Sequence, residues 1–524
     1  MFKRRGLLKI IIVIFLVLFS TIVASAEKKS KGRLDIFEKT LQQMGFNVQE
    51  GLVDFPDIVD MCCECQIFSC FANNPSSPYG LFVLPPAPDQ EEVKNPYAEW
   101  FAQNEKNDNP WYDDNQKPYP ANGSWFWRLR PDEAVVFLGT TPPEMTYFGF
   151  TGYLYDRYSY GAPKPPVCTS EGKPDRDPPD SSLNRIPIFG SLGDTVNYRT
   201  VRVSGAKKNP FLKDVVFILT ADQKVERQIR KALHKAGYGD EMINTIAAPQ
   251  DLVRLGVNSE SDSLLFLIRM ATEITPAVKS YMASPGTLLR LSPDPPISSS
   301  GLDPFPPPKL RVRGTGDTEV DLLPSVDQLG KAIMETFQGG YNAEPISTVN
   351  WYEGYNCIEN NENCLGDNRD TPYILTGFNP LTHVPYQDLT LDDGMFYVVY
   401  GVNHKASGKA IYSNISVQGW ERKCSPVLIG NEDMIGSASA YLGPEDPAAD
   451  MMYAYVIARP GGCSLLPVQQ QGFCREVSYD CKGGVLEEEP IAIGFRAYVE
   501  SKTKVGAAYS EIVIDRIVKF TPKP

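Results

Sequence analysis

The sequence contains little histidine and lacks the motifs that mark several large enzyme classes. Three histidines in 524 residues argue against metal sites built from several imidazoles. No G-x-S-x-G elbow, G-x-x-x-x-G-K-[ST] loop, H-E-x-x-H helix or strand-linked G-x-G-x-x-G is present. Nothing therefore points to an α/β-hydrolase, a P-loop nucleotide hydrolase, a zinc metalloprotease of that type or a dinucleotide-binding enzyme.

An excess of positive charge is also missing. Lysine and arginine number 51 against 64 aspartates and glutamates, and the net charge of −13 gives no field that would gather nucleic acid. Only one apolar stretch, at the N-terminus, approaches the length of a membrane span, which excludes a multi-pass protein. The 42% of apolar residues is enough for two cores and excludes disorder as the main state.

The N-terminus has the pattern of an export signal. A basic cluster at residues 3–5 precedes ten apolar residues at 10–19, and small residues follow at 24–26. The pattern predicts a signal peptide over residues 1–26 and a secreted, periplasmic or cell-surface protein. The alternatives are an uncleaved anchor, which would be the only membrane contact, and a twin-arginine leader, which would favour an enzyme.

Eleven cysteines are an odd number for a protein expected in an oxidising compartment. Cys357 and Cys364 are predicted to form a disulfide, because they close a short polar loop. Cys62 and Cys65 have metal or redox spacing, but without a second such pair we expect disulfides in their cluster. One cysteine of the N-terminal half is expected to stay free, and the six of the C-terminal half to form up to three bridges.

A proline-rich segment predicts the domain boundary. Seven of the sixteen residues from Pro293 to Pro308 are proline, which removes backbone donors and favours an extended linker. We therefore predict an α+β domain over residues 27–285, a linker over 286–309 and a β-rich domain over 310–524.

Periodicity predicts the elements of both domains. In the first, helices are expected at 34–44 and after a capping box of Thr220 and Gln223, and strands at 134–138, 147–157, 215–219 and 264–268. In the second, a helix capped by Ser325 and Gln328 is expected at 326–338, followed by strands at 396–402, 410–417, 452–458, 491–499 and 511–518. Such short strands are typical of an antiparallel β-sandwich or jelly roll. Asn122 and Asn414, each in an N-x-[ST] sequence, are predicted to be exposed.

His404 is the best catalytic candidate. It continues the period-two pattern of the strand at 396–402 and follows Asp392 and Asp393, which suit the orientation of a general base. Pairing with His383 around a metal is a second possibility, and a turn histidine beside solvated aspartates is the purely structural interpretation.

Glu362, Asp367 and Asp370 belong to an oxygen-rich loop that offers ligands for Ca²⁺, although its spacing is not that of an EF-hand. A disulfide-closed acidic loop without an ion is the competing interpretation.

Aromatic residues are concentrated around Trp111, at 125–127 and at Trp351. Exposed rings stack on sugars or on protein partners, whereas buried rings form core. We predict an exported, two-domain protein that binds a ligand or partner, carbohydrate among the candidates, or has a structural role. The alternative is an extracytoplasmic hydrolase or metal-dependent enzyme that uses His404 with Asp392 or Asp393.

Overall fold

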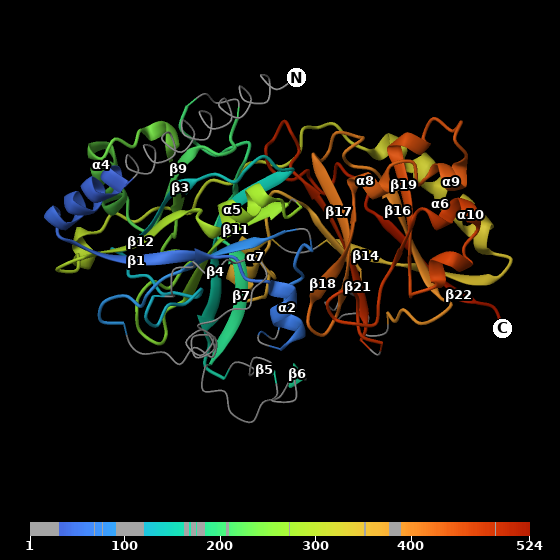
Figure 1. The fold of residues 1–524 in the computed structure, drawn as a ribbon, viewed down its shortest axis with the longest axis horizontal. Coiled ribbons are helices and arrows are strands. Elements are labelled where there is room, and N and C mark those ends of the chain that lie inside the picture. Colours follow the sequence, from blue (N-terminus) through green and yellow to red (C-terminus); the bar gives the residue numbers. More distant parts are fainter. Residues whose placement is uncertain are drawn as a thin grey trace, which may run out of the picture.

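The computed structural model describes residues 31–524 apart from 66, 68, 76, 91–119, 162–166, 169–173, 176–183, 206–208, 272, 351–352, 377–388 and 488. The fold is mixed, consists mostly of sheet and is rich in antiparallel pairing. N-terminal and C-terminal elements lie side by side along the longest axis (Figure 1). Among the residues described, no helix combines the length and the apolar character needed to cross a bilayer.

A curled ten-stranded sheet dominates the N-terminal part. In spatial order its strands are β10 (Ile243–Ala247), β9 (Asp214–Thr220), β3 (Ala134–Thr140), β12 (Gly286–Pro293), β1 (Phe46–Asp54), β2 (Tyr79–Val83), β11 (Ser263–Ala271), β4 (Tyr147–Tyr158) and β7 (Arg185–Ser191), with β8 (Val196–Asn197) beside β4. Among the described strands of this sheet, only β9 and β10 pair in parallel. A small separate pair is formed by β5 (Val167–Cys168) and β6 (Pro174–Asp175).

Helices cover the end of this sheet that contains β9. The helix over residues 31–43 and α4 (Gln223–Lys235) bury their apolar sides against β3, β9 and β12. On the other face, α5 (Pro276–Ala283) packs into the largest core cluster. The short helices α2 (Ile58–Cys63) and α7 (Gly354–Asn360) lie toward the C-terminal part, α7 against β7.

Two five-stranded sheets form the C-terminal part. One has the order β13 (Tyr341–Ile346), β22 (Arg516–Pro522), β16 (Phe396–Val402), β19 (Met452–Ala458), β20 (Cys474–Glu476). The other has the order β14 (Thr348–Asn350), β15 (Tyr373–Thr376), β21 (Ile491–Tyr498), β17 (Tyr412–Gly419), β18 (Cys424–Gly430). Side chains from both sheets meet in one buried cluster.

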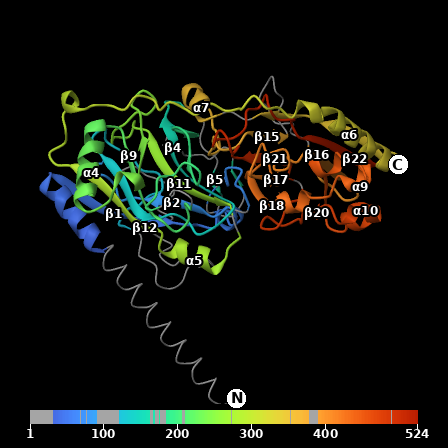
Figure 2. The same cartoon turned by 90° about the horizontal axis from the view of Figure 1, so that it is seen from above.

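The outer face of the first of these sheets is covered by α6 (Leu323–Phe337), whose apolar stripe packs on β16, β19 and β22 (Figure 2). Shorter helices follow at the periphery: α8 (Asn431–Met434), α9 (Ser439–Leu442) and α10 (Val468–Gln471). The second sheet, with β17 and β21, faces the N-terminal part (Figure 1).

Most predicted elements are present, but both predicted helix caps are wrong. Asp222 caps α4 by accepting hydrogen bonds from the amides of Lys224 and Val225, while Thr220 donates its hydroxyl to the Glu133 carbonyl. Helix α6 begins earlier than predicted, at Leu323, so Ser325 lies inside its first turn. The capping pattern located neither helix start: a nearby aspartate caps α4, and α6 begins after Leu322 without a side-chain cap.

The predicted linker is partly a core strand. Residues 286–293 form β12, which pairs with both β1 and β3 in the middle of the large sheet. The segment after it is fastened as well: the amide of Phe305 donates to the Ala221 carbonyl, and that of Arg311 to Asp194.

Asn122 is exposed, as predicted, but Asn414 is buried, which contradicts the prediction. The alternation of β17 predicted a solvated face, and that face is instead covered by the N-terminal part of the chain. The Asn414 amide nitrogen donates to Asn74 Oδ1 at 3.2 Å and to the Tyr412 hydroxyl at 2.7 Å.

Candidate ligand-binding site

His404 lies just after β16, and its partners differ from the predicted ones. Its Nδ1 is 2.9 Å from Glu319 Oε1 and its Nε2 is 3.7 Å from Asp515 Oδ2. The predicted partners are engaged elsewhere: Asp392 accepts a hydrogen bond from the Thr390 hydroxyl, and Asp393 from the Tyr479 hydroxyl. The structure therefore does not bring His404 together with Asp392 or Asp393. His383 is outside the described residues.

The surroundings of His404 do not suit a general base. Burial lowers the pKa of His404, but the carboxylates of Glu319 and Asp515 outweigh it and raise that pKa to about 10. The ring is protonated at neutral pH and has no free lone pair with which to accept a proton. The ring is also only 4% exposed, and it forms a buried charge cluster with Glu319 and Asp515.

The predicted Ca²⁺ ligands do not converge on one point. Asp367 accepts hydrogen bonds from the amide and hydroxyl of Ser191 and from the amide of Gly354. Asp370 accepts from the hydroxyl of Tyr147 and the side-chain amide of Asn197.

Glu362 is exposed, away from this buried network. Within the described part of the chain, the groups of three or more side chains close enough to share an ion consist of cysteines. Burial raises the pKa of Asp367 to about 6 and that of Asp370 to about 7. The two aspartates therefore fasten the loop onto β4, β7 and β8, rather than assemble a calcium site with Glu362.

The disulfide between Cys357 and Cys364 is confirmed. Three further bridges join Cys62 to Cys70, Cys63 to Cys481 and Cys463 to Cys474, and Cys65 is also disulfide-bonded. The bridge from Cys63 joins α2 to Cys481, 418 positions later, and so links the N-terminal part of the protein covalently to the C-terminal part.

The free thiol is not where the sequence predicted it. Among the described cysteines, the reduced one is Cys424, which begins β18 in the C-terminal half. Its sulfur lies within 4.8 Å of those of the Cys62–Cys70 and the Cys63–Cys481 bridges. Burial raises the pKa of the Cys424 thiol to about 12, so it stays protonated and is a poor metal ligand.

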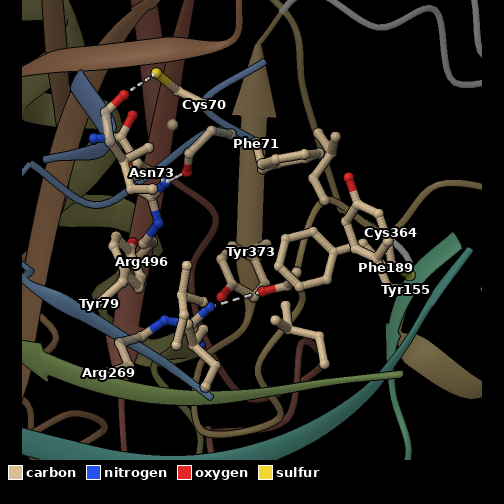
Figure 3. Close-up of a pocket in the computed structure, with 18 of the residues that line it drawn as sticks. Cys70, Phe71, Asn73, Tyr79, Tyr155, Phe189, Arg269, Cys364, Tyr373 and Arg496 are labelled. Atoms are coloured by element: carbon tan, nitrogen blue, oxygen red, sulfur yellow. Dashed lines mark hydrogen bonds between the residues drawn. The ribbon is translucent and has the colours of Figure 1, made fainter. Parts of the chain in front are cut away.

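A cavity lies where the second C-terminal sheet faces the large sheet (Figure 3). About 1050 Å³ is free of atoms when its open mouth is included, and about 100 Å³ admits the centre of a water molecule. Its walls are mainly aliphatic and aromatic, with Trp125, Phe126, Tyr155 and Phe189 among the rings. These aromatic residues are packed rather than exposed, and Trp125 is 3% exposed.

Strand β11 forms one wall because of its two-residue period. Leu265, Leu267 and Arg269 share the face that lines the cavity. The intervening Phe266 and Ile268 point into the core cluster on the opposite side. Alternate residues of this apolar strand therefore pack into two different core clusters, and its one charged residue, Arg269, lines the cavity.

The opposite wall comes from β15 and β21. Tyr373 pairs with Arg496 across these two strands, and both line the cavity with Tyr498. The guanidinium of Arg496 lies 5.8 Å from the centre of the Tyr373 ring. No aspartate or glutamate is among the described residues that line the cavity.

The two arginines lack the carboxylate partner that Arg157, Arg185 and Arg290 have. Arg269 is 5% and Arg496 6% exposed, and neither forms an ion pair with any residue that the structure describes. Burial of an unpaired guanidinium costs several kcal/mol of desolvation in order-of-magnitude terms. Sequence reasoning missed both residues, although an arginine that interrupts the apolar run of β11 was a usable signal.

The comparisons with known proteins give no functional assignment. No protein-family model and no curated protein matches the sequence. Among solved structures, the VPA0106 protein of Vibrio parahaemolyticus aligns over 75% of this chain and 86% of its own, with 7% identity and a TM-score of 0.31. A putative uncharacterized protein of Burkholderia cenocepacia aligns over 85% of this chain and 77% of its own, with 10% identity and a TM-score of 0.30. Both likenesses are too distant to support an argument about this chain.

Proposed function

We propose that this protein is an exported binding protein that holds a small, largely apolar molecule in the cavity between the large sheet and β15 and β21. The observation that carries the proposal is the cavity itself, which is lined by aromatic and aliphatic side chains together with two buried arginines. Pockets of this kind, apolar with a few polar groups, are the usual form of small-molecule sites.

The size of the cavity indicates the size of the ligand. The 100 Å³ open to the centre of a water molecule corresponds to about seven to ten water molecules. A ligand of about ten non-hydrogen atoms therefore fits without rearrangement of the walls. Stacking of a carbohydrate on exposed rings is not supported by Trp125 or Trp127, because both are buried.

An extracytoplasmic location fits this function. Several disulfides join the described cysteines, and the signal-peptide pattern at residues 1–26, outside the described residues, gives a route of export. We also propose that the large sheet belongs to an α+β domain and the two five-stranded sheets to a sandwich-like domain, since no strand is shared between them.

Binding is tested by isothermal titration of the purified mature protein with octanol, a neutral molecule of suitable size. We expect saturable binding in the wild type, and a loss of about tenfold or more in affinity for Ile58→Trp, because Ile58 is a half-buried residue of the cavity wall and a larger side chain occupies the space.

Val59→Trp is the matched control. Val59 is the next residue of α2, is equally half-buried and is not part of the wall, so its enlargement should leave octanol binding unchanged. Absence of binding to octanol, to octanoate and to any small molecule extracted from the purified protein would contradict the proposed function. Equal losses in both tryptophan variants would place the ligand elsewhere.

A further inference from the structure

We propose that the ligand is an anion, a carboxylate on an apolar body, whose charged group is bound by Arg269 with the help of Arg496. This inference rests on the proposed function and gives the chemical class of its ligand. The observation behind it is that Arg269 lines the cavity and that its buried Nη1 has no hydrogen-bond partner in the described chain.

The contacts of Arg269 leave its Nη1 without an acceptor. Its Nη2 donates to the Gly366 carbonyl at 2.8 Å, and its guanidinium lies 5.6 Å from the centre of the Tyr79 ring. An arginine offers five N–H donors in a rigid planar fork that matches a carboxylate. The unpartnered Nη1 of this buried guanidinium can therefore donate to an acceptor that is not part of the described chain.

Arg496 adds a second positive charge whose protein contacts are all neutral. Its Nη1 donates to the Ser416 hydroxyl at 2.7 Å, and its Nη2 to the Ala72 carbonyl at 2.7 Å. Arg290, by contrast, is neutralised by Glu133 at 3.1 Å. The buried Arg459 resembles Arg496 in donating only to neutral groups, among them the carbonyls of Leu391 and Val485. The cavity thus holds two cations and, among the described residues of its wall, no carboxylate.

The cavity has a charged side and an apolar side. Figure 3 shows Arg269, Tyr79 and Arg496 on one side, and Phe71, Tyr155 and Phe189 on the other. A molecule with a carboxylate at one end and a hydrocarbon body at the other matches both. The anion would compensate the buried charge, and the body would displace water from the apolar walls.

The test compares three ligands of one chain length, octanoate, octanol and octylamine, by isothermal titration at neutral pH. We expect the wild type to bind octanoate about tenfold or more tightly than octanol, and not to bind octylamine. Arg269→Gln should lower the affinity for octanoate by about tenfold or more and so abolish the preference for octanoate over octanol. Retained octanol binding shows that the variant cavity is folded.

A stability measurement separates ligand binding from a purely structural role. Without ligand, Arg269→Gln should leave the melting temperature unchanged or raise it, because it removes an uncompensated buried charge. A clear fall would indicate an arginine needed for the fold. If that variant does not fold, the relative affinities of the wild type for octanoate, octanol and octylamine decide whether the ligand is an anion.

Equal binding of octanoate and octanol by the wild type would overturn the anion inference and leave the proposed function intact. Absence of binding by all three ligands, and by any small molecule extracted from the purified protein, would contradict the proposed function itself.

Discussion

Buried charges in this protein are of two kinds at the level of single residues. His404 and Arg290 are each held against a carboxylate, as is usual for ionised groups removed from water. Arg269 and Arg496 have only neutral partners. The second kind also includes Arg459, whose guanidinium donates to backbone carbonyls such as those of Leu391 and Val485. Arg269 differs from it because its buried Nη1 has no hydrogen-bond partner in the described chain.

The charge cluster at His404 makes a prediction about pH. Its folded pKa of about 10 lies above the value of 6.5 for the unfolded chain, so its contribution to stability is complete below about pH 6.5 and declines as the pH approaches 10. We expect His404→Gln to lower the free energy of unfolding by about 3–5 kcal/mol near pH 6.

The difference between wild type and His404→Gln should then shrink steadily in urea titrations repeated toward pH 10. A difference that stayed constant or grew over this interval would mean that the ring is neutral in the folded protein. The sequence predicted that His404 follows β16, but it could not predict Glu319, because that partner is 85 residues away and belongs to no recognisable pattern.

At the level of elements, local pattern predicted the buried strands well. Strands β16 and β19 have the predicted bounds, since each combines an apolar run with nearby turn residues. Prediction failed where tertiary contacts decided the outcome. Strand β22 begins at Arg516 instead of residue 511. Strand β12 lies wholly within residues 286–309, which the proline-rich pattern had led us to predict as a linker.

The candidate site was harder to predict than the fold. Its walls come from α2, β2, β4, β7, β11, β15 and β21, which are far apart in the sequence. Arg269 and Arg496 reach the same cavity only because the sheet that contains β21 packs against the sheet that contains β11. No spacing rule within a single sequence encodes such a meeting.

The loop that contains Asp367 gives a second prediction. Asp367→Ala removes the acceptor of three hydrogen-bond donors at the junction with β7. We expect a loss of about 2–4 kcal/mol in the free energy of unfolding, measured by chemical denaturation. Because burial raises the pKa of Asp367 to about 6, the loss should be larger near pH 5 than near pH 8.

Glu362→Ala is the control for this loop, since its side chain is exposed and a change within about 0.5 kcal/mol is expected. A similar loss in both variants, or stabilisation of the wild type by added Ca²⁺ that both variants abolish, would restore the calcium interpretation.

At the level of the whole molecule, the separate folding of the two predicted domains, residues 27–285 together with β12 and residues 310–524, remains a prediction that limited proteolysis can test. The first cut by a broad-specificity protease is expected within residues 294–300, six of which are exposed. Both fragments should migrate as one band without reductant, because the Cys63–Cys481 bridge joins them, and as two bands after reduction.

Early cleavage elsewhere, with residues 294–300 protected, would argue against this boundary. Separation of the fragments without reductant would argue against the bridge.

The same bridge sets an order of events during biosynthesis. Cys63 has no native partner until residue 481 has been made, and at about 5–20 residues per second that interval is roughly 20–80 s. Throughout this time its nearest neighbours, Cys62, Cys65 and Cys70, are already available for incorrect pairing. We therefore expect correct maturation of this chain to need an oxidation system that can undo early bonds, and a cell with a weak disulfide isomerase to accumulate mispaired protein.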